Sequence, residues 1–540
     1  MNLSDIILHS LIKKDNINTE KAVSLIYDLI DHSYNNQLND IKLIKESELN
    51  SIEYKLRLDT KTSYGLEKTI SQIKRRLTTS KQLTEVEEAH YIFGVTDKGE
   101  LGNITLEETE ATYNIFKELV ESKKLNANIC NKFEYLFGNS SIYYVIINKK
   151  NNIKFNELKI SFVGTSSSGK TTTISNIIHG SISKKKINLL FKHEHEKLSG
   201  KTSSIKKEII GLKSGKIVNY KTIKDSNSTD IAIESDIIIN ILDYPGTNDN
   251  KKIKNIFKGL LGYSSDLIFI VVECFKLDDP PTKEIIDLYY NISKLLNIKS
   301  VILANKIDIL DNPICLTTYY PDLPIIYISN ILENGINNLI EYIENIAISD
   351  KNKIITKQTG NLFTVMEIIN IPDKGVVFTG NMDIGNYNLG DSIILTNGIE
   401  CIETKIISIH KKYIDSTIIY QGETGSIQLE NVYSIPNYYK RSVITRKPLV
   451  SYNNINFVIN NITELLNLSI EQEFKLYIGN MKTNAIVKTI TKTNDKIILL
   501  LKINSIAIPK LEMLGQDVGI LRDENYNTYY GKVCIISIVN

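Results

Sequence analysis

Residues 164–171 of this chain read Gly-Thr-Ser-Ser-Ser-Gly-Lys-Thr. They follow the apolar run LKISFV and precede the helical segment TTISNIIHG, which is the strand–loop–helix context that the phosphate-binding pattern GxxxxGK[ST] requires. The glycines let the loop wrap around a phosphate, whose charge meets backbone N–H groups and the positive end of the following helix. We therefore predict that a nucleotide's phosphates are bound by Gly164, Thr165, Ser166, Ser167, Ser168, Gly169, Lys170, Thr171 and Thr172.

A second motif follows the apolar run IIINILD and consists of Asp243, Tyr244, Pro245 and Gly246. An Asp at the carboxyl end of a strand beside a P-loop can hold Mg²⁺ through a water molecule, while the hydroxyl of Thr171 ligates the metal directly. Glycine at 246 lets the backbone N–H approach the γ-phosphate without a side-chain clash. These residues predict a Mg²⁺ site next to the phosphates, where Lys170 neutralises the β- and γ-phosphates.

The sequence NKID at residues 305–308 follows a third apolar run, SVILA. It predicts which nucleotide base the site binds. The carboxylate of Asp308 can accept hydrogen bonds from guanine N1–H and the N2 amino group, a donor pair that adenine lacks. Lys306 is expected to lie over the base and Asn305 to tie this loop to the P-loop, while Ser329 and Asn330 end the next strand near the base oxygen. We therefore predict a guanine nucleotide in the crevice that forms at the carboxyl ends of parallel strands. An ATP-binding protein is the weaker alternative.

The runs around these motifs predict the fold. Between 157 and 348 strand-like and helical segments alternate, which indicates a mostly parallel sheet covered by helices on both faces. Before it, helical spacing, a capping box at Thr105–Glu108 and strand-like runs near 90–95 and 141–149 predict an α+β domain containing a βαβ unit. After about 358, short strands separated by Gly, Asn and Asp turns predict small β-barrels.

The predicted order is therefore an N-terminal α+β domain, an α/β P-loop domain and two β-barrels. The expected boundaries are 1–155, 156–350, 356–440 and 445–540, with a basic linker at 438–448.

Composition excludes several other classes of protein. The 540 residues carry 64 Lys+Arg and 62 Asp+Glu, a net charge of +2 that is too small for a general nucleic-acid coat. Five widely spaced cysteines without a Cys-x-x-Cys pair argue against a zinc ribbon and a disulfide framework. The N-terminus lacks the basic region of a signal peptide, and no apolar run approaches the ~20 residues needed to span a bilayer. A cytoplasmic, soluble protein is expected.

The order of these motifs, followed by two barrels, resembles translational GTPases of the elongation factor Tu and elongation factor 1-alpha class. The stretch HEHEKLSGKTSSI at 193–205 resembles the first switch of the eukaryotic GTP-binding protein 1 and 2 family, and RDENYNTYYGKVCIISIV at 522–539 resembles its last strands. The resemblance implies that Thr202 completes the Mg²⁺ shell in the GTP state. It also implies a monomeric GTPase that engages the ribosome, with tRNA as a further partner. The abundance of Ile, Asn and Lys indicates an A/T-rich genome, such as that of a virus or a parasite.

The first-switch stretch also allows another interpretation. His193 and His195 could bind a metal ion, because positions i and i+2 on a strand share a face. No third ligand lies at metal-binding spacing, and the resemblance favours a switch. The lysines at 184–186 and 206–207 are interpreted as solvated faces, with contact to RNA as the alternative.

Two departures from the class bear on catalysis. Thr247 stands where these GTPases usually carry the His that positions the attacking water, and Ser166–Ser168 replace a loop that usually contains Asp. Loss of a water-positioning group can cost orders of magnitude in rate, whereas the binding groups Lys170 and Asp308 remain. We therefore predict tight GTP binding with slow or atypical hydrolysis. The alternative is a GTP-loaded regulatory or binding module that does not hydrolyse GTP.

Overall fold

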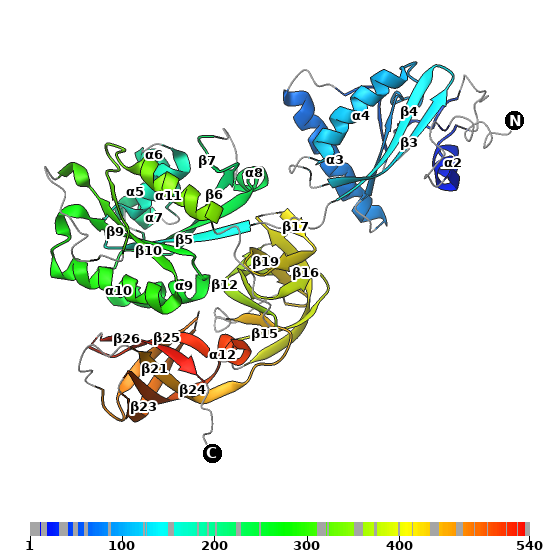
Figure 1. The fold of residues 1–540 in the computed structure, drawn as a ribbon. Coiled ribbons are helices and arrows are strands. Elements are labelled where there is room, and N and C mark those ends of the chain that lie inside the picture. The colour runs from blue at the N-terminus through cyan, green and yellow to red at the C-terminus, as the bar shows by residue number, and fades with distance from the viewer. Residues whose placement is uncertain are drawn as a thin grey trace. The chain divides into compact units, whose positions relative to one another are not determined.

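The computed structural model divides into two compact units, Met1–Ile153 and Lys154–Asn540, which are described separately (Figure 1). The structure describes residues 11, 19–31, 41–46, 52–58, 63–84, 88–121, 125, 127–149, 156–180, 183–191, 194–199, 202–222, 228–247, 250–309, 320, 323–349, 360–371, 375–397, 400–412, 414–432, 442–460, 468–479, 481–493, 495–514, 516–525 and 527–534.

The first unit is built on a four-stranded sheet in the order β1-β2-β4-β3. Strands β1 and β2 are parallel, and the other neighbours are antiparallel. Alternate residues of β4 enter two cores: Tyr144 and Ile146 pack with α2, whereas Tyr143 and Val145 pack with α3 and α4. The elements are α2 (Thr19–Tyr27), β1 (Ile52–Lys55), α3 (Ser63–Thr84), β2 (Glu88–Phe93), α4 (Leu106–Glu121), β3 (Ala127–Phe137) and β4 (Ser140–Lys149).

The βαβ unit predicted from the strand-like runs near 90–95 and 141–149 is wrong, although the helix between them is confirmed. The Glu108 N–H donates to Thr105 Oγ1 (3.3 Å) and the Thr105 N–H donates to Glu108 Oε2 (3.2 Å), which closes the capping box before α4. The chain then forms β3 before β4, and β4 runs antiparallel to β2. A register shift between Ile129 and Asn131 breaks the two-residue alternation of β3, so the strand was not recognisable from its sequence.

The second unit begins with a seven-stranded sheet in the order β11-β10-β9-β5-β8-β6-β7, here called the α/β part. The first five strands are parallel, and β6 runs antiparallel to both of its neighbours, β8 and β7, which confirms the mostly parallel sheet. In Figure 1, α9 and α10 lie below this sheet and α5 and α11 above it. Every residue of β9, an interior strand of this sheet, is buried, as expected for a strand covered on both faces.

The elements of the α/β part run from residue 156 to residue 349. They are β5 (Asn156–Gly164), α5 (Lys170–His179), α6 (Lys184–Leu189), α7 (Glu194–Ser199), β6 (Lys206–Lys213), β7 (Lys216–Val218), α8 (Ser228–Glu234), β8 (Ile237–Asp243), α9 (Asn250–Tyr263), β9 (Leu267–Glu273), η2 (Cys274–Lys276), α10 (Pro280–Leu296), β10 (Lys299–Asn305), η3 (Ile307–Ile309), β11 (Ile325–Ile328) and α11 (Ile336–Ser349).

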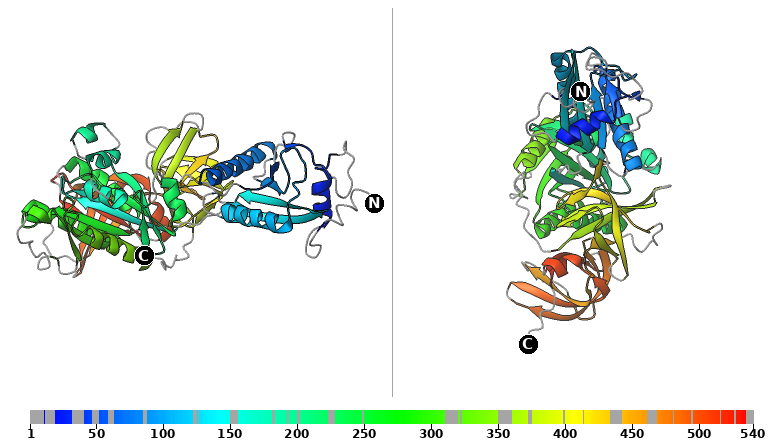
Figure 2. Two further views of the ribbon diagram at one scale, coloured as in Figure 1. Left: turned by 90° about the horizontal axis from the view of Figure 1, so that it is seen from above. Right: turned by 90° about the vertical axis from the view of Figure 1, so that its right-hand side faces the viewer.

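Two closed β-barrels follow, as predicted. In the first, pairing of β15 with β16 joins the ends of the strand row β15-β20-β12-β13-β19-β16, and the second closes as β21-β24-β23-β22-β25-β26. Strand β20 falls within the segment 438–448 that was predicted as a linker. It pairs with β12 and β15 and thereby completes the first barrel. Figure 2 shows the yellow strands of the first barrel and the orange-to-red strands of the second as separate bodies.

The strands of the first barrel, with two short strands beside them, are β12 (Leu362–Ile371), β13 (Gly375–Ile384), β14 (Asn386–Asn388), β15 (Ser392–Thr396), β16 (Cys401–Lys411), β17 (Ile414–Ser416), β18 (Ile418–Tyr420), β19 (Thr424–Leu429) and β20 (Val443–Thr445). The second barrel contains β21 (Ser451–Asn460), β22 (Glu473–Ile478), β23 (Met481–Lys492), β24 (Lys496–Ala507), α12 (Pro509–Leu514), β25 (Gln516–Arg522) and β26 (Thr528–Cys534).

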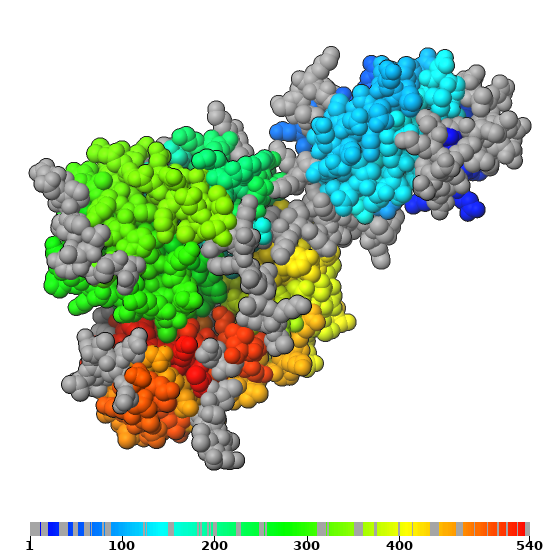
Figure 3. Space-filling view, viewed as in Figure 1, coloured from blue at the N-terminus to red at the C-terminus, as the bar shows by residue number. Residues whose placement is uncertain are grey.

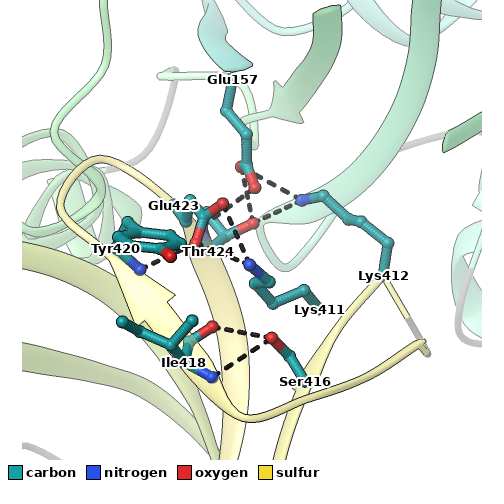
Figure 4. Close-up of polar contacts among 8 residues, drawn as sticks. All are labelled: Glu157, Lys411, Lys412, Ser416, Ile418, Tyr420, Glu423 and Thr424. Atoms are coloured by element: carbon teal, nitrogen blue, oxygen red, sulfur yellow. Dashed lines mark hydrogen bonds and ion pairs between the residues drawn. The ribbon is translucent and has the colours of Figure 1, made fainter. Parts of the chain in front are cut away.

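Both barrels contact the α/β part. The second does so through an apolar contact, in which the rings of Phe257 in α9 and Tyr477 in β22 lie edge to face at 5.3 Å. Figure 3 shows the green surface of the α/β part in direct contact with the red surface of this barrel. The first barrel is joined instead by buried charges (Figure 4). Glu157 of β5 accepts from the Lys412 ammonium (3.1 Å), the Thr424 hydroxyl (2.8 Å) and the Asn240 amide (2.7 Å).

Replacing Glu157 with Gln is expected to lower the unfolding free energy of the second unit by about 3 kcal/mol, because it leaves the buried Lys412 ammonium without its counter-charge. The side chains of Glu157 and Lys412 are only 1% and 9% exposed. Lys488→Ala is the matched control, since its partner Glu471 is 64% exposed and such pairs contribute less than about 1 kcal/mol. Thermal and urea unfolding measure the difference, and equal shifts in the two variants would contradict the prediction.

Candidate functional site

The P-loop connects β5 to α5 and has the backbone that its glycines predict. Gly164 and Gly169 have φ angles of 135° and 95°, and a Cβ at 164 would lie 2.1 Å from the Val271 carbonyl oxygen. Helix α5 begins at Lys170, and no side chain caps its N-terminus. Its first N–H groups therefore face the loop, where a helix N-terminus favours an anion.

Lys170 lies inside this loop and is only 5% exposed. Its ammonium donates to the carbonyl oxygens of Thr165 (2.6 Å) and Gly164 (3.3 Å), and the Ser168 hydroxyl also donates to Thr165 (2.9 Å). A buried cation that donates to neutral carbonyls can exchange them for phosphate oxygens, to which its bonds are charge-assisted on both sides. The loop therefore fits a polyphosphate.

Three oxygen-bearing side chains meet beside α5. The Thr171 hydroxyl donates to Asp243 Oδ2 (2.7 Å), the Thr202 hydroxyl lies 3.3 Å from the same oxygen, and the two hydroxyls are 2.9 Å apart. Asp243 is 2% exposed, and its Oδ1 accepts no hydrogen bond from the described residues. Burial raises the pKa of this carboxyl, an effect that Thr171, Lys170 and Lys206 only partly offset. A buried, incompletely satisfied carboxylate with two hydroxyls fits a hard cation such as Mg²⁺.

The first-switch segment differs from the sequence interpretation in two respects. Residues 194–199 form the helix α7, so His195 does not lie on a strand, and His193 falls outside the described residues. Lys206, interpreted as part of a solvated face, is 1% exposed and pairs with Glu196 at 3.2 Å. Lys207 is exposed. Within the described ranges, no group of three or more His, Cys, Asp or Glu side chains could hold a metal ion.

The segment after β8 contacts the P-loop through its backbone. A Cβ at Gly246 would lie 2.4 Å from Ser166 Cα, so the two loops touch. The Tyr244 side chain is fully buried in the core that contains α9, and Pro245 is also buried. Tyr244 was predicted to contact the nucleotide, but its side chain points into this core.

Thr247 is 6% exposed and its hydroxyl is engaged on two sides. It donates to the Gly164 carbonyl oxygen (2.8 Å), to which the Thr247 N–H also donates (3.2 Å). It accepts from the hydroxyl of Tyr289 in α10 (3.3 Å). In this arrangement Thr247 fastens the segment after β8 to the start of the P-loop.

The NKID residues lie at the end of β10, next to the P-loop. The Asn305 side-chain amide donates to the Ser168 carbonyl oxygen (2.7 Å), so the two loops are hydrogen-bonded across 137 residues of sequence. The Ser329 hydroxyl donates to Asp308 Oδ1 (2.5 Å) and fixes that carboxylate. The Asn330 amide donates to Thr173 Oγ1 (2.9 Å) in α5. The structure thus brings both predicted halves of the site together.

Sequence reasoning missed two residues here. Glu273, 5% exposed, ends β9 and forms ion pairs with Lys306 and Lys276. Phe275 is 36% exposed, and the Lys306 ammonium lies 5.9 Å from its ring centroid. Glu273 could have been found, because it follows the apolar run LIFIVV at a strand end just as Asp243 does. Phe275 carried no comparable signal.

Comparisons with known proteins agree with this architecture. Residues 156–349 match the family described as Elongation factor Tu GTP binding domain. The chain is 24% identical over 432 residues to GTP-binding protein 2 of Homo sapiens. This alignment covers 71% of this chain and 69% of the human protein. The resemblance inferred from the motifs is thereby confirmed. These matches give no support to a viral origin.

Two solved structures share the fold. A bacterial selenocysteine-specific elongation factor, EF-Sec, superposes with a TM-score of 0.55 at 18% identity, covering 72% of this chain and 60% of that protein. The S. cerevisiae Ski7 GTPase-like domain, bound to GDP and inorganic phosphate, gives a TM-score of 0.53 at 14% identity, covering 71% of this chain and 98% of that domain.

Proposed function

We propose that this chain, whose residues 156–349 are a GTPase domain of the elongation factor Tu type, binds GTP and GDP with Mg²⁺ and engages the ribosome while GTP is bound. The observation that carries the proposal is the meeting of Lys170, Thr171, Thr202 and Asp243 at one edge of the sheet. Phosphoryl-transfer sites need these groups: a cation, metal-binding hydroxyls and a carboxylate.

The parts of the site have separate roles in this proposal. The phosphates lie against residues 164–172 and the backbone of residues 243–246. Thr171 and Thr202 hold Mg²⁺ directly, and Asp243 holds it through water. The base lies against Asn305, Lys306, Asp308, Ser329 and Asn330, and Mg²⁺ supplies charge neutralisation between the β- and γ-phosphates.

Ribosome engagement is supported by the fold that this chain shares with the bacterial selenocysteine-specific elongation factor EF-Sec. We propose that tRNA is a further partner and that the protein acts as a monomer in the cytoplasm. None of the described helices has the length and apolar character needed to cross a bilayer.

The proposed hydrolysis is slow or atypical. Thr replaces the usual His at 247, and its hydroxyl is hydrogen-bonded within the domain, to Gly164 and Tyr289. A hydroxyl held in this way is not free to orient water. The second candidate function is therefore a GTP-loaded regulatory or binding module without turnover, which the same observation favours.

Sedimentation through a sucrose cushion tests ribosome engagement. The protein is expected to pellet with purified ribosomes in the presence of a non-hydrolysable GTP analogue and to remain in the supernatant with GDP. Lys170→Met, which removes the phosphate-binding charge, is expected to abolish the nucleotide dependence. Equal pelleting with both nucleotides would contradict a GTP-dependent encounter.

Single-turnover phosphate release separates the two candidate functions. For the wild type we expect release that is slow alone and faster with ribosomes, which would exclude the module without turnover. Thr247→His should change the rate, because His can position water but gives up the hydrogen bond to Gly164. No release from wild type under either condition, with release recovered in Thr247→His, would favour the non-hydrolysing module instead.

A further inference from the structure

We propose that Glu196 and Lys206 are positioning residues, a buried brace that holds Thr202 at the Mg²⁺ site. The inference rests on the proposed function, because it concerns how that site is assembled. Neither residue was predicted to take part in the site.

Glu196 connects α7 to the residue that follows Thr202. Its Oε1 accepts two hydrogen bonds from Ser203, one from the backbone N–H (2.6 Å) and one from the hydroxyl (2.7 Å). Glu196 has no exposed surface. Two short bonds from one residue to a single carboxylate oxygen fix the backbone of Ser203, and therefore also that of its covalent neighbour Thr202.

Lys206 supplies the charge that makes this buried carboxylate tolerable. Its ammonium lies 3.2 Å from Glu196 Oε2 and 4.1 Å from the centroid of the Phe191 ring, while its backbone is in register with Asp243 in the β6–β8 ladder. Burial alone would raise the pKa of Glu196, but the bonds from Ser203 and the charge of Lys206 outweigh it and lower the pKa to about 2. The pair therefore ties α7 to β6, directly beside the metal site.

The result of this brace is the position of Thr202. The residue is 7% exposed, and its hydroxyl lies 2.9 Å from the Thr171 hydroxyl and 3.3 Å from Asp243 Oδ2. A metal ligand that is already in place loses little conformational entropy when the ion binds. Glu196 and Lys206 would thus increase Mg²⁺ affinity without touching the ion.

The test uses the full chain with the pair replaced by neutral side chains of similar size, Glu196→Gln with Lys206→Met. Replacing both avoids leaving one buried charge without its partner. The dissociation rate of a fluorescent GTP analogue is measured at a series of Mg²⁺ concentrations. The readout is the Mg²⁺ concentration that gives half-maximal retention of the analogue. We expect this concentration to rise about tenfold, the effect of losing roughly one well-placed hydrogen-bonding ligand. Dissociation in excess EDTA is expected to be unchanged.

A double-mutant cycle with Thr202→Val distinguishes positioning from a general structural role. If the brace acts through Thr202, the combined variant should lose no more Mg²⁺ affinity than Thr202→Val alone. Additive losses would overturn the inference. Glu194→Gln is the matched control on the same helix, since its side chain is 84% exposed, and it should stay within about twofold of wild type.

The remaining outcomes separate this inference from the proposed function. If wild type and the brace variant both retain GTP only with Mg²⁺, and need the same Mg²⁺ concentration, the inference about the brace is overturned and the proposed function stands. Wild type that fails to bind GTP would overturn the proposed function. Thermal unfolding checks that the variant folds. If it does not, Ser203→Ala removes only one of the bonds to Glu196, and an unchanged Mg²⁺ requirement in that variant would count against the brace.

Discussion

Asp308→Asn is expected to lower the affinity for GTP on the order of 10³-fold and to raise the affinity for xanthosine triphosphate. The carboxylate would accept from two guanine donors, whereas Asn turns one acceptor into an N–H₂ donor that faces a donor of the base. Xanthine carries a carbonyl where guanine carries the N2 amino group, so it accepts from that N–H₂. Ser329 holds the group at 308 through its hydroxyl (2.5 Å), which keeps the substituted side chain in the same place.

Competition against a fluorescent GTP analogue measures this change for GTP, ATP and xanthosine triphosphate. Asp278→Asn is the matched control, because it makes the same chemical change on an exposed side chain that pairs with Lys283 at 3.6 Å. The control should bind the three nucleotides as wild type does. A GTP affinity that survives in Asp308→Asn would show that the base is read elsewhere, and ATP competing equally in wild type would exclude a guanine-specific site.

Lys170→Met is expected to lower the affinity for GTP by about 10²- to 10³-fold. Methionine keeps most of the volume of the lysine side chain but loses the ammonium, and charge-assisted bonds to phosphate oxygens contribute about 1.5–3 kcal/mol each. Because Lys170 is 5% exposed, solvent screens these bonds only weakly.

The thermal unfolding temperature of nucleotide-free Lys170→Met should not fall, since removal of the charge also removes the cost of keeping it buried. Lys213→Met serves as the control, because this lysine in β6 is 55% exposed and pairs with Glu234 away from the P-loop. Isothermal titration calorimetry with GTP and Mg²⁺ measures both variants. Binding at wild-type affinity in Lys170→Met would contradict the placement of the phosphates at this loop.

Most of the fold was predictable, because apolar runs with a clear period mark strands and helices directly. The run LIFIVV belongs to β9, which is buried throughout, and the short strands after residue 358 form two closed barrels. The motifs at strand ends were predictable for the same reason: parallel strands present their carboxyl ends at one edge. The contact of Asn305 with the P-loop and the meeting of Thr171 with Asp243 follow from that geometry.

The remaining features depend on contacts between distant segments. Strand β3 was missed because a bulge near Ile129 interrupts its alternation. Lys206 was assigned to the surface because lysine is usually exposed, whereas Glu196 on another element makes its burial possible. Thr247 could be recognised as a departure from the class, but its bond to Gly164 and its contact with Tyr289 depend on how α10 packs.

The close approach of the P-loop to the NKID loop limits how this sequence can diverge. A Cβ at Gly169 would lie 2.2 Å from the Asn305 side-chain nitrogen, the atom that donates to Ser168. An alanine at 169 would therefore need a shorter residue at 305, and that change would in turn remove the bond to the P-loop. Either substitution alone would therefore disturb the contact between the two loops. Because φ at Gly169 is 95°, an alanine there stays strained even beside a shorter residue at 305, so related sequences should retain both residues. Redesign of the base pocket therefore also has to preserve the P-loop.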